Sequence, residues 1–280
     1  MLNYFVIDSH RGAFRNGVVE NSVPAFEESH REGANCVECD IRRTDDDEIV
    51  LIHNNTINHI ASLAEKVPTA AEFNQKPVGK VSSHSLAYLK ALKFPNDAEI
   101  MTLLEFLQLL KRLRIGAQIE LKEFGYEEQV LEVIQEAEID YGELIGPIVC
   151  TSFNWLSIKK LIKKAKSYDI PLYSHEGDVG QAFGFQAISL GAFYGKWVLR
   201  RFHKFDVWGG MTHYRYMPVD RLNYAHKMGV KFCPRIPNDE DLALEYLKSG
   251  VDGFETDDVP FIRDVVKKSG RGDELSPIPR

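Results

Sequence analysis

Short apolar runs alternate along the chain with longer segments in which apolar residues recur every three or four positions. The short runs have the length and β-branched character of buried strands, and the longer segments have the spacing of helices with one apolar face. The predicted strands lie at residues 4–8, 35–40, 115–121, 147–151, 170–174, 205–208, 230–233 and 251–256. The predicted helices lie at residues 22–32, 103–113, 127–138, 155–167, 182–202, 218–228, 240–249 and 259–268. This alternation is typical of an α/β protein with parallel strands.

A ninth apolar run, at residues 48–53, does not fit the alternation. Residues 41–47 are too few for the crossover of about a dozen residues that joins parallel neighbours, and they are rich in turn-forming aspartate. We therefore expect a short antiparallel hairpin after the second strand. The other strands predict a single (β/α)8 TIM barrel over residues 1–270, with a polar tail at 271–280 that frays. A doubly wound open sheet is the alternative architecture.

Composition indicates which partners and which cellular compartment to expect. The 280 residues carry a net charge of −7 without a cluster of Lys and Arg, so no nucleic-acid partner is expected. Cys36 and Cys39 form a C-x-x-C pair, but strand positions three apart point to opposite faces, so we expect free buried thiols. The sequence shows neither a secretory signal nor an apolar span of roughly 20 residues, which predicts a cytoplasmic protein. It predicts no oligomeric state.

Acidic residues follow two neighbouring strands of the predicted barrel. Glu38 and Asp40 are two positions apart, so both project to one face of the second strand, and Glu120 ends the next. Active sites of such barrels lie at the carboxyl ends of the strands, so we expect the three carboxylates to converge there. Like charges at that range repel unless a cation lies between them, and oxygen ligands suit Mg²⁺ or Ca²⁺.

Histidines and basic residues flank the expected metal site. His10 follows the first strand and His53 ends the hairpin, and two imidazoles that titrate near neutrality can act as acid and base in one reaction. Arg11 and Lys122 supply the positive charge that a phosphate oxyanion requires. His175 follows the predicted fifth strand and has no assigned role.

Ordered blocks of residues resemble the glycerophosphodiester phosphodiesterase family. The blocks are His10-Arg11-Gly12 with Glu20-Asn21, Glu38-Cys39-Asp40 with Ile52-His53, Glu120-Leu121-Lys122, and residues 250–253 with Thr256-Asp257. Each block alone has little specificity, but their order over residues 9–257 is specific. The resemblance implies a (β/α)8 barrel that hydrolyses glycerophosphodiesters to an alcohol and sn-glycerol 3-phosphate. The site residues that it implies are His10 and His53 as the acid–base pair, Glu38, Asp40 and Glu120 as ligands of Mg²⁺ or Ca²⁺, Arg11 and Lys122 as phosphate-binding cations, and Glu20 as a residue that orders the site.

Four residues depart from the pattern of that family. Asn54 follows His53 where Asp is usual, and Arg235 stands near the end of the seventh strand where Trp is usual. Asp8 and Glu255 replace apolar residues in the first and last strands. These strands are neighbours in a closed barrel, so we expect Asp8, Arg235 and Glu255 to form a mutually compensating charged cluster under the pocket. Arg235 would then also contact the substrate.

Other functions remain open. The same catalytic set would serve lysophospholipids cleaved in the manner of phospholipase D, and an apolar channel beside the site would distinguish that substrate. A substrate hydroxyl in place of water, giving a cyclic phosphate first, is a further possibility. A barrel that binds a phosphodiester without turnover and an unrelated Mg²⁺-dependent enolate enzyme are the other classes, and the latter needs a base on a later strand. The aromatic and basic residues of 182–202 are compatible with a membrane-surface helix, although packing against the barrel is the preferred interpretation.

Overall fold

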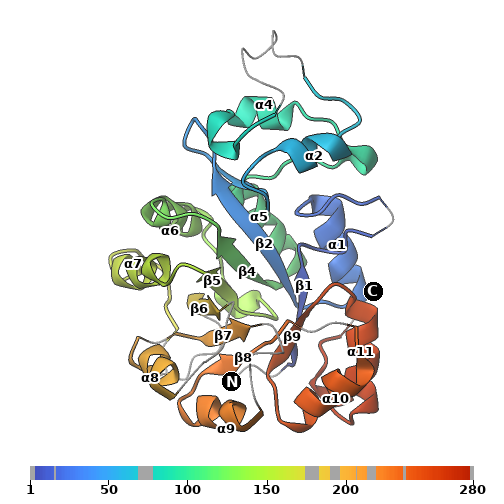
Figure 1. Cartoon of the computed structure of the whole chain (residues 1–280), viewed down its shortest axis with the longest axis vertical. Coiled ribbons are helices and arrows are strands. Elements are labelled where there is room, and N and C mark those ends of the chain that lie inside the picture. Colours follow the sequence, from blue (N-terminus) through green and yellow to red (C-terminus); the bar gives the residue numbers. More distant parts are fainter. Residues whose placement is uncertain are drawn as a thin grey trace.

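The computed structural model describes residues 4–15, 17–68, 78–173, 183–189, 196–205, 207–212, 219–235 and 238–277. Its centre is a curled sheet of parallel strands with helices outside it (Figure 1). The strands are β1 (Val6–His10), β2 (Cys36–Arg43), β3 (Ile49–Leu51), β4 (Gly116–Leu121), β5 (Ile148–Ser152), β6 (Phe183–Ser189), β7 (Gly209–Thr212), β8 (Lys231–Phe232) and β9 (Gly253–Thr256). The predicted α/β class with a parallel sheet is therefore confirmed.

The sheet runs in the order β8-β7-β6-β5-β4-β2-β1-β9, so its first and last strands are β8 and β9. These two ends approach each other at an isolated parallel bridge between Arg235 and Glu255. The backbone NH of Glu255 donates to the carbonyl of Pro234 at 3.1 Å, and the NH of Asp252 donates to Phe232 at the same distance. β3 pairs antiparallel with the end of β2, with Ile41 opposite Leu51.

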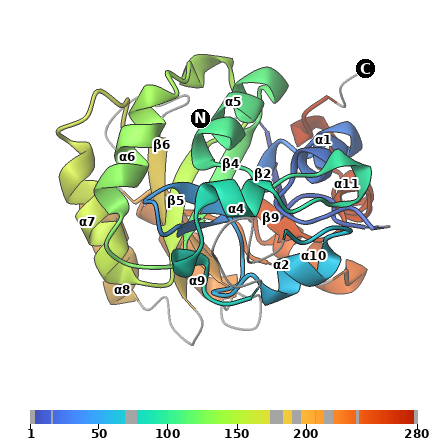
Figure 2. The same ribbon diagram turned by 90° about the horizontal axis from the view of Figure 1, so that it is seen from above.

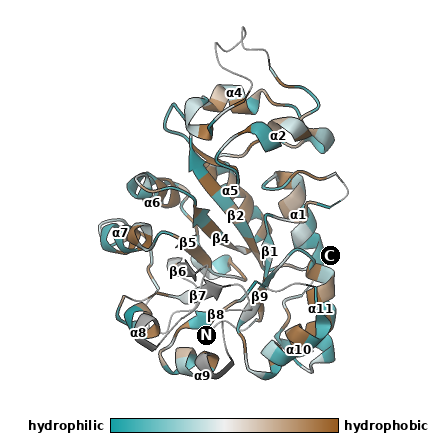
Figure 3. Ribbon diagram, in the orientation of Figure 1, coloured by the Kyte–Doolittle hydropathy of each residue, from teal (hydrophilic) through white to brown (hydrophobic). Residues whose placement is uncertain are grey.

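The surrounding helices each bury an apolar stripe against the sheet. They are α1 (Val23–Glu32), α5 (Leu103–Leu113), α6 (Glu127–Glu136), α7 (Trp155–Ala165), α8 (Lys196–Lys204), α9 (Val219–Lys227), α10 (Glu240–Lys248) and α11 (Val259–Lys268). α5 begins with a capping box, in which Thr102 accepts from the NH of Glu105 at 3.2 Å and the Glu105 carboxylate accepts from the NH of Thr102 at 2.8 Å. Helices such as α10 and α11 show both hydrophobic and hydrophilic sides (Figure 3). Within the described part of the chain, no helix has the length and apolar character needed to span a bilayer.

The predicted positions of the fifth and sixth barrel strands are wrong. Residues 170–173 belong to no strand, and β6 instead occupies the first part of the segment predicted as a helix at 182–202. The described helix of that segment is α8, and residues 190–195 lie outside the described residues. β7 likewise begins at Gly209, after the predicted run at 205–208.

Glycines inside β6 and β7 pack closely against neighbouring segments. A Cβ atom on Gly184 would lie 3.0 Å from the Cβ of Trp208, and one on Gly209 would lie 3.0 Å from the carbonyl oxygen of Lys231. Glycine at such positions lets neighbouring chain segments approach closely. The predicted helix at 182–202 runs through Gly184, and the predicted strand at 205–208 ends before Gly209, because the sequence does not reveal these close contacts.

A second layer lies across the end of β2 (Figures 1 and 2). It contains α2 (Asn58–Leu63), α4 (Leu86–Lys90) and the 3-10 helices Val81–Ser83 and Pro95–Asp97. Its apolar side chains form a core of their own, whose members include Ile57, Ile60, Val81, Tyr88, Leu89 and Leu92. Val50 and Ile52 belong to this second core, whereas Ile49 and Leu51 belong to the main one. β3 therefore joins the two layers through the alternation of its side chains.

The cysteines are buried and free, as predicted. Cys36 packs with Val6, Val149, Trp208 and Cys233, whereas its C-x-x-C partner Cys39 packs in the main core. The two thiols therefore lie on opposite faces of β2.

The segment after Gly270, which was expected to fray, makes hydrogen bonds to the body of the protein over residues 271–277. Arg271 donates through Nη1 to the carbonyl of Val251 at 3.0 Å, and the carbonyl of Glu274 accepts from the NH of Phe5 at 2.7 Å. The carbonyl of Ser276 accepts from Arg263 at 3.0 Å, and Ser276 is buried. Backbone carbonyls, which composition does not reveal, attach this segment to the body of the protein.

Candidate active site

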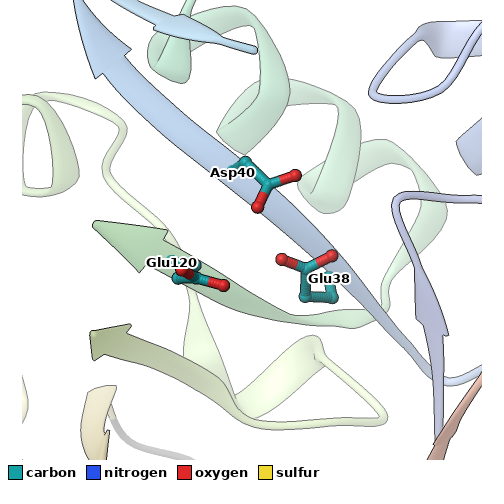
Figure 4. Close-up of side chains that lie close together, drawn as sticks. All are labelled: Glu38, Asp40 and Glu120. Atoms are coloured by element: carbon teal, nitrogen blue, oxygen red, sulfur yellow. The ribbon is translucent and has the colours of Figure 1, made fainter. Parts of the chain in front are cut away.

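Three carboxyl groups meet between β2 and β4, two from the middle of β2 and one near the carboxyl end of β4 (Figure 4). Glu38 and Asp40 project from one face of β2, and Glu120 lies opposite Asp40 in the register of β4. One oxygen from each side chain lies within 4.8 Å of the others, and all three residues are buried. The convergence expected from strand parity is therefore present.

Lys122 provides a positive charge between two of these carboxylates. Its Nζ lies 2.7 Å from Oδ1 of Asp40 and 2.6 Å from Oε1 of Glu120. Burial alone would lower the pKa of Lys122, but the two carboxylates raise it above its ordinary value. Burial would likewise raise the pKa of Asp40, yet Lys122 and Arg11 hold it below its usual range.

The other two carboxyl groups lack sufficient positive charge. Burial and the neighbouring charge of Asp40 raise the pKa of Glu38 well above its ordinary value. Burial raises the pKa of Glu120 to about 7 despite the opposing effect of Lys122. A cation bound among the three would favour their ionised forms, and a set of carboxylate oxygens alone suits a hard ion. The residues therefore fit Mg²⁺ or Ca²⁺.

Arg11 lies above the same cluster in a tight turn. Its backbone NH donates to Oε2 of Glu38 at 3.1 Å, and its guanidinium lies 3.2 Å from Asp40 and 3.1 Å from Glu20. The residue after it, Gly12, has a φ of +80°, and a Cβ there would lie 2.7 Å from the Cβ of Ala25. Only glycine meets both constraints, so the turn that presents Arg11 depends on it.

His53 lies on one side of the carboxylates, two residues after β3. The amide oxygen of Asn54 accepts a hydrogen bond from Nδ1 of His53 at 2.8 Å. Asn54 stands where Asp is usual after this histidine. Burial lowers the pKa of His53, so the neutral ring is favoured. A cavity of about 280 Å³ opens here, lined by Arg42, His53, Asn54, Asn55, Glu120, Leu121, Lys122, Ser152, Phe153 and Asn154.

His10 lies at the end of β1, on the β9 side of the carboxylates. Its Nδ1 lies 2.8 Å from Oδ1 of Asp257, and this hydrogen bond lowers the pKa of the carboxyl group. Its Nε2 lies 2.9 Å from Nη1 of Arg235. Because a carboxylate only accepts, Asp257 fixes the tautomer with a proton on Nδ1 and leaves Nε2 as the nitrogen available for proton exchange.

The charged cluster expected beneath the pocket is present in part. Nε of Arg235 lies 3.5 Å from Oε1 of Glu255, and Oε2 of the same carboxylate accepts from the side-chain amide of Gln118 at 3.2 Å. Asp8 lies opposite Glu255 in the register of β1 and β9. Among the described residues no ion pair joins Asp8 to Arg235, and burial raises the pKa of Asp8 well above its ordinary value. Burial and the neighbouring Glu255 thus favour the neutral form of Asp8, which lowers the cost of burying this acid without a charge pair.

Asp257 and Asn21 were not predicted as site residues. The Asn21 side chain donates to Oδ2 of Asp40 at 3.2 Å and accepts from the backbone NH of Asp40 at 3.3 Å. Both residues could have been predicted as site residues, because Asp257 follows the last strand and Asn21 belongs to the first block. The candidate His175 lies outside the described residues.

Comparison with known proteins gives one family. The sequence profile of the glycerophosphoryl diester phosphodiesterase family matches residues 10–260. A glycerophosphodiester phosphodiesterase of Caldanaerobacter subterraneus is 26% identical over 279 residues, which cover 95% of this chain and 99% of the relative.

Solved structures have a similar fold at lower identity. A phosphodiesterase of Oleispira antarctica, in complex with the product sn-glycerol-3-phosphate, superimposes with a TM-score of 0.71 at 21% identity, covering 94% of this chain and 97% of its own. A glycerophosphodiester phosphodiesterase of Agrobacterium tumefaciens superimposes with a TM-score of 0.66 at 17% identity, covering 92% and 98%. The family expected from the ordered residue blocks is the one that matches.

Proposed function

The chain belongs to the glycerophosphoryl diester phosphodiesterase family, and on this premise we propose that it hydrolyses glycerophosphodiesters with a divalent cation and the acid–base pair His10 and His53. Water is added across the P–O bond to the head group, so the alcohol leaves with one proton and sn-glycerol 3-phosphate keeps the new oxygen. The observation that carries the proposal is the buried cluster of Glu38, Asp40 and Glu120, with His10 opposite Glu38 in the strand register and His53 close enough to interact with Asp40.

The side chains around the cluster have separate roles in the proposed reaction. Arg11 and Lys122 carry positive charge beside the cluster, which offsets the repulsion between a phosphodiester and the carboxylates. Ion pairs with Glu20 and Asp40 hold the two cations in place. One histidine accepts the proton of the attacking water and the other donates a proton to the leaving oxygen. Nε2 is the exchanging atom of His10, because Asp257 holds Nδ1.

Glu38, Asp40 and Glu120 would hold the cation. Bound there, Mg²⁺ or Ca²⁺ supplies Lewis-acid polarisation of the phosphoryl oxygen. We also propose that the sheet closes into a (β/α)8 barrel, with β3 as a hairpin extension of β2. The bridge between Arg235 and Glu255 and the antiparallel pairing of β3 support this arrangement.

A coupled assay for sn-glycerol 3-phosphate tests the activity. We expect release from glycerophosphocholine or glycerophosphoethanolamine in Mg²⁺ or Ca²⁺, and no release after chelation. His10→Ala and Glu120→Ala should each lower kcat/KM by at least about 100-fold, the usual effect of losing an acid–base or electrostatic group. His59→Ala, at an exposed position of α2, is the matched control. An active chelated enzyme, or a His10→Ala variant as active as His59→Ala, would contradict the proposal.

A lysophospholipid substrate is a second candidate, favoured by one feature of the surface. Phe124, Phe153 and Leu156 are exposed by 56%, 44% and 61%, and they occupy the loops after β4 and β5 and the first turn of α7. Phe153 also lines the cavity beside His53, with Lys122 above its ring. These side chains offer apolar surface for an acyl chain at the mouth of the site.

Leu156→Ser, which changes the exposed surface without touching the cavity lining, separates the two substrates. If an acyl chain lies on this surface, the variant should cleave lysophosphatidylcholine at least about tenfold more slowly and glycerophosphocholine at an unchanged rate, since only the former loses apolar contact. Leu63→Ser, at another exposed apolar position, controls for the loss of a surface side chain. Equal effects on both substrates would rule out the lipid candidate.

A further inference from the structure

Arg235 contacts the atom of His10 that the proposed reaction uses. Its Nη1 lies 2.9 Å from Nε2 of His10, whereas its contacts to the carboxylates of Asp257 and Glu255 are longer, at 3.4 and 3.5 Å. The Arg235 side chain is 39% exposed, so it lies at the rim of the site rather than beneath it.

The direction of this hydrogen bond is fixed by chemistry. A guanidinium group donates and has no lone pair to accept, so Nε2 of His10 must be unprotonated. The other ring nitrogen directs its proton to Asp257, so the 3.2 Å approach of Arg235 to Nδ1 is not a second hydrogen bond. Arg235 therefore occupies the lone pair that His10 would use as a base.

A reacting oxygen that exchanges a proton with Nε2 must come within roughly 2.6–3.2 Å of it. Nη1 of Arg235 already lies at that distance, so the guanidinium and the substrate compete for one position. An anionic phosphoryl group is a stronger partner for arginine than a neutral imidazole and accepts two parallel hydrogen bonds. Arg11 and Lys122 lie closer to their carboxylates, at 3.1–3.2 Å and 2.6–2.7 Å, than Arg235 does at 3.4–3.5 Å, so Arg235 has the weakest hold on its acidic partners.

We propose, on the basis of the proposed function, that Arg235 is a substrate-operated latch: it covers Nε2 of His10 in the free enzyme and moves to a phosphoryl oxygen of the substrate, which exposes the base. Glu255, which is 2% exposed, anchors the guanidinium close enough for both positions. His10 is therefore free to act as a base only when an anionic phosphodiester is bound.

Nitrogen-15 NMR of histidine-labelled protein in Mg²⁺ buffer, titrated with inorganic phosphate, tests the latch. In the wild type we expect the His10 Nε2 resonance to shift as phosphate binds and the guanidinium leaves. In Arg235→Ala the resonance should start displaced, and phosphate should bind about 10- to 100-fold more weakly, the scale of a charge-assisted hydrogen bond. Arg235→Lys, with a single-point charge, should recover part of the binding. Arg15→Ala is the matched control, because the Arg15 side chain has the same 39% exposure and also pairs with two acids.

Two results would overturn the latch: an Nε2 resonance that phosphate does not move in the wild type, or an Arg235→Ala variant that binds phosphate as tightly as Arg15→Ala. Steady-state assays give an independent readout, with kcat/KM for glycerophosphocholine expected to fall about 10- to 100-fold in Arg235→Ala. If the wild type hydrolyses no glycerophosphodiester, the proposed function fails, whereas the phosphate titration still decides the role of Arg235.

Discussion

Glu120 is a buried carboxyl group with a pKa raised to about 7, against a reference value of 4.5. Between these two pH values the folded protein binds more protons at Glu120 than the unfolded chain does. The contribution of Glu120 to the stability of the metal-free protein therefore falls as pH rises from about 5 to 8. Relative to the wild type, Glu120→Gln should gain thermal stability over this interval, measured as the difference in Tm at each pH.

Metal and a surface variant serve as controls for this prediction. Mg²⁺ should raise the Tm of the wild type more at pH 8 than at pH 5, because protons compete with the cation at low pH. Glu136→Gln, at an exposed position of α6, should give a difference from the wild type that does not vary with pH. A Glu120→Gln difference that is equally constant would show that Glu120 ionises normally.

Asp257 determines which nitrogen of His10 carries the proton. In Asp257→Asn the amide can donate to Nδ1, which moves the proton to Nε2 and removes the free lone pair. We expect kcat to fall at least about 10-fold, with the tautomer change visible by nitrogen-15 NMR of His10. Asp239→Asn, which replaces one good helix cap by another at α10, should leave both unchanged. An Asp257→Asn enzyme with normal kcat and tautomer would show that the contact has no positioning role.

The approach of the three carboxylates could be predicted because strand parity and barrel geometry are general rules, as Glu38 and Asp40 illustrate. The contacts of Arg235 with His10 and of Asp257 with the same ring could not be predicted so closely. They depend on where β8 and β9 meet β1, and the sequence contains no local signal for distances across that junction.

At the level of elements, the cost of replacing a glycine depends on how closely neighbouring atoms approach it. Gly253 begins β9, and a Cβ at this position would lie 2.4 Å from the carbonyl oxygen of Val6 and 2.5 Å from its Cβ. Gly253→Ala should therefore separate β9 from β1 and lower the free energy of unfolding in urea by about 1–3 kcal/mol, the usual effect of overpacking. At Gly272 the nearest atom to a Cβ would be 3.6 Å away, so Gly272→Ala should change stability little. Equal effects of the two substitutions would contradict the close approach of β9 to β1.

The helices α1, α5, α7 and α11 could be placed from periodicity, because one face of each contacts the sheet over several turns. β6 could not, because its aromatic residues and the helical spacing of the following segment suggested one long helix over 182–202. The apolar spacing of a short run fits either structure, and the decisive information is the close packing of Gly184 against Trp208.

At the scale of the whole molecule, residues 271–277 connect segments from both ends of the chain, since Glu274 contacts Phe5 and Ser276 contacts Arg263. A chain ending at Gly270 should lose about 2 kcal/mol or more of stability in urea, given roughly 1 kcal/mol for each hydrogen bond lost. A chain ending at Pro277 is the control, because it keeps these contacts. Equal stability of the two would support the expected boundary of a dispensable tail at residue 271.

β3 has a consequence for how activity is lost on heating. Its alternate side chains, Val50 and Leu51, belong to different cores, and His53 follows two residues later. If the second core, around α2 and α4, unfolds before the main core, amide hydrogens in α4 and around residue 50 should begin to exchange faster together, because the two form one cooperative unit. His53 would then lose its support while the parallel strands below remain intact, so inactivation would precede global denaturation.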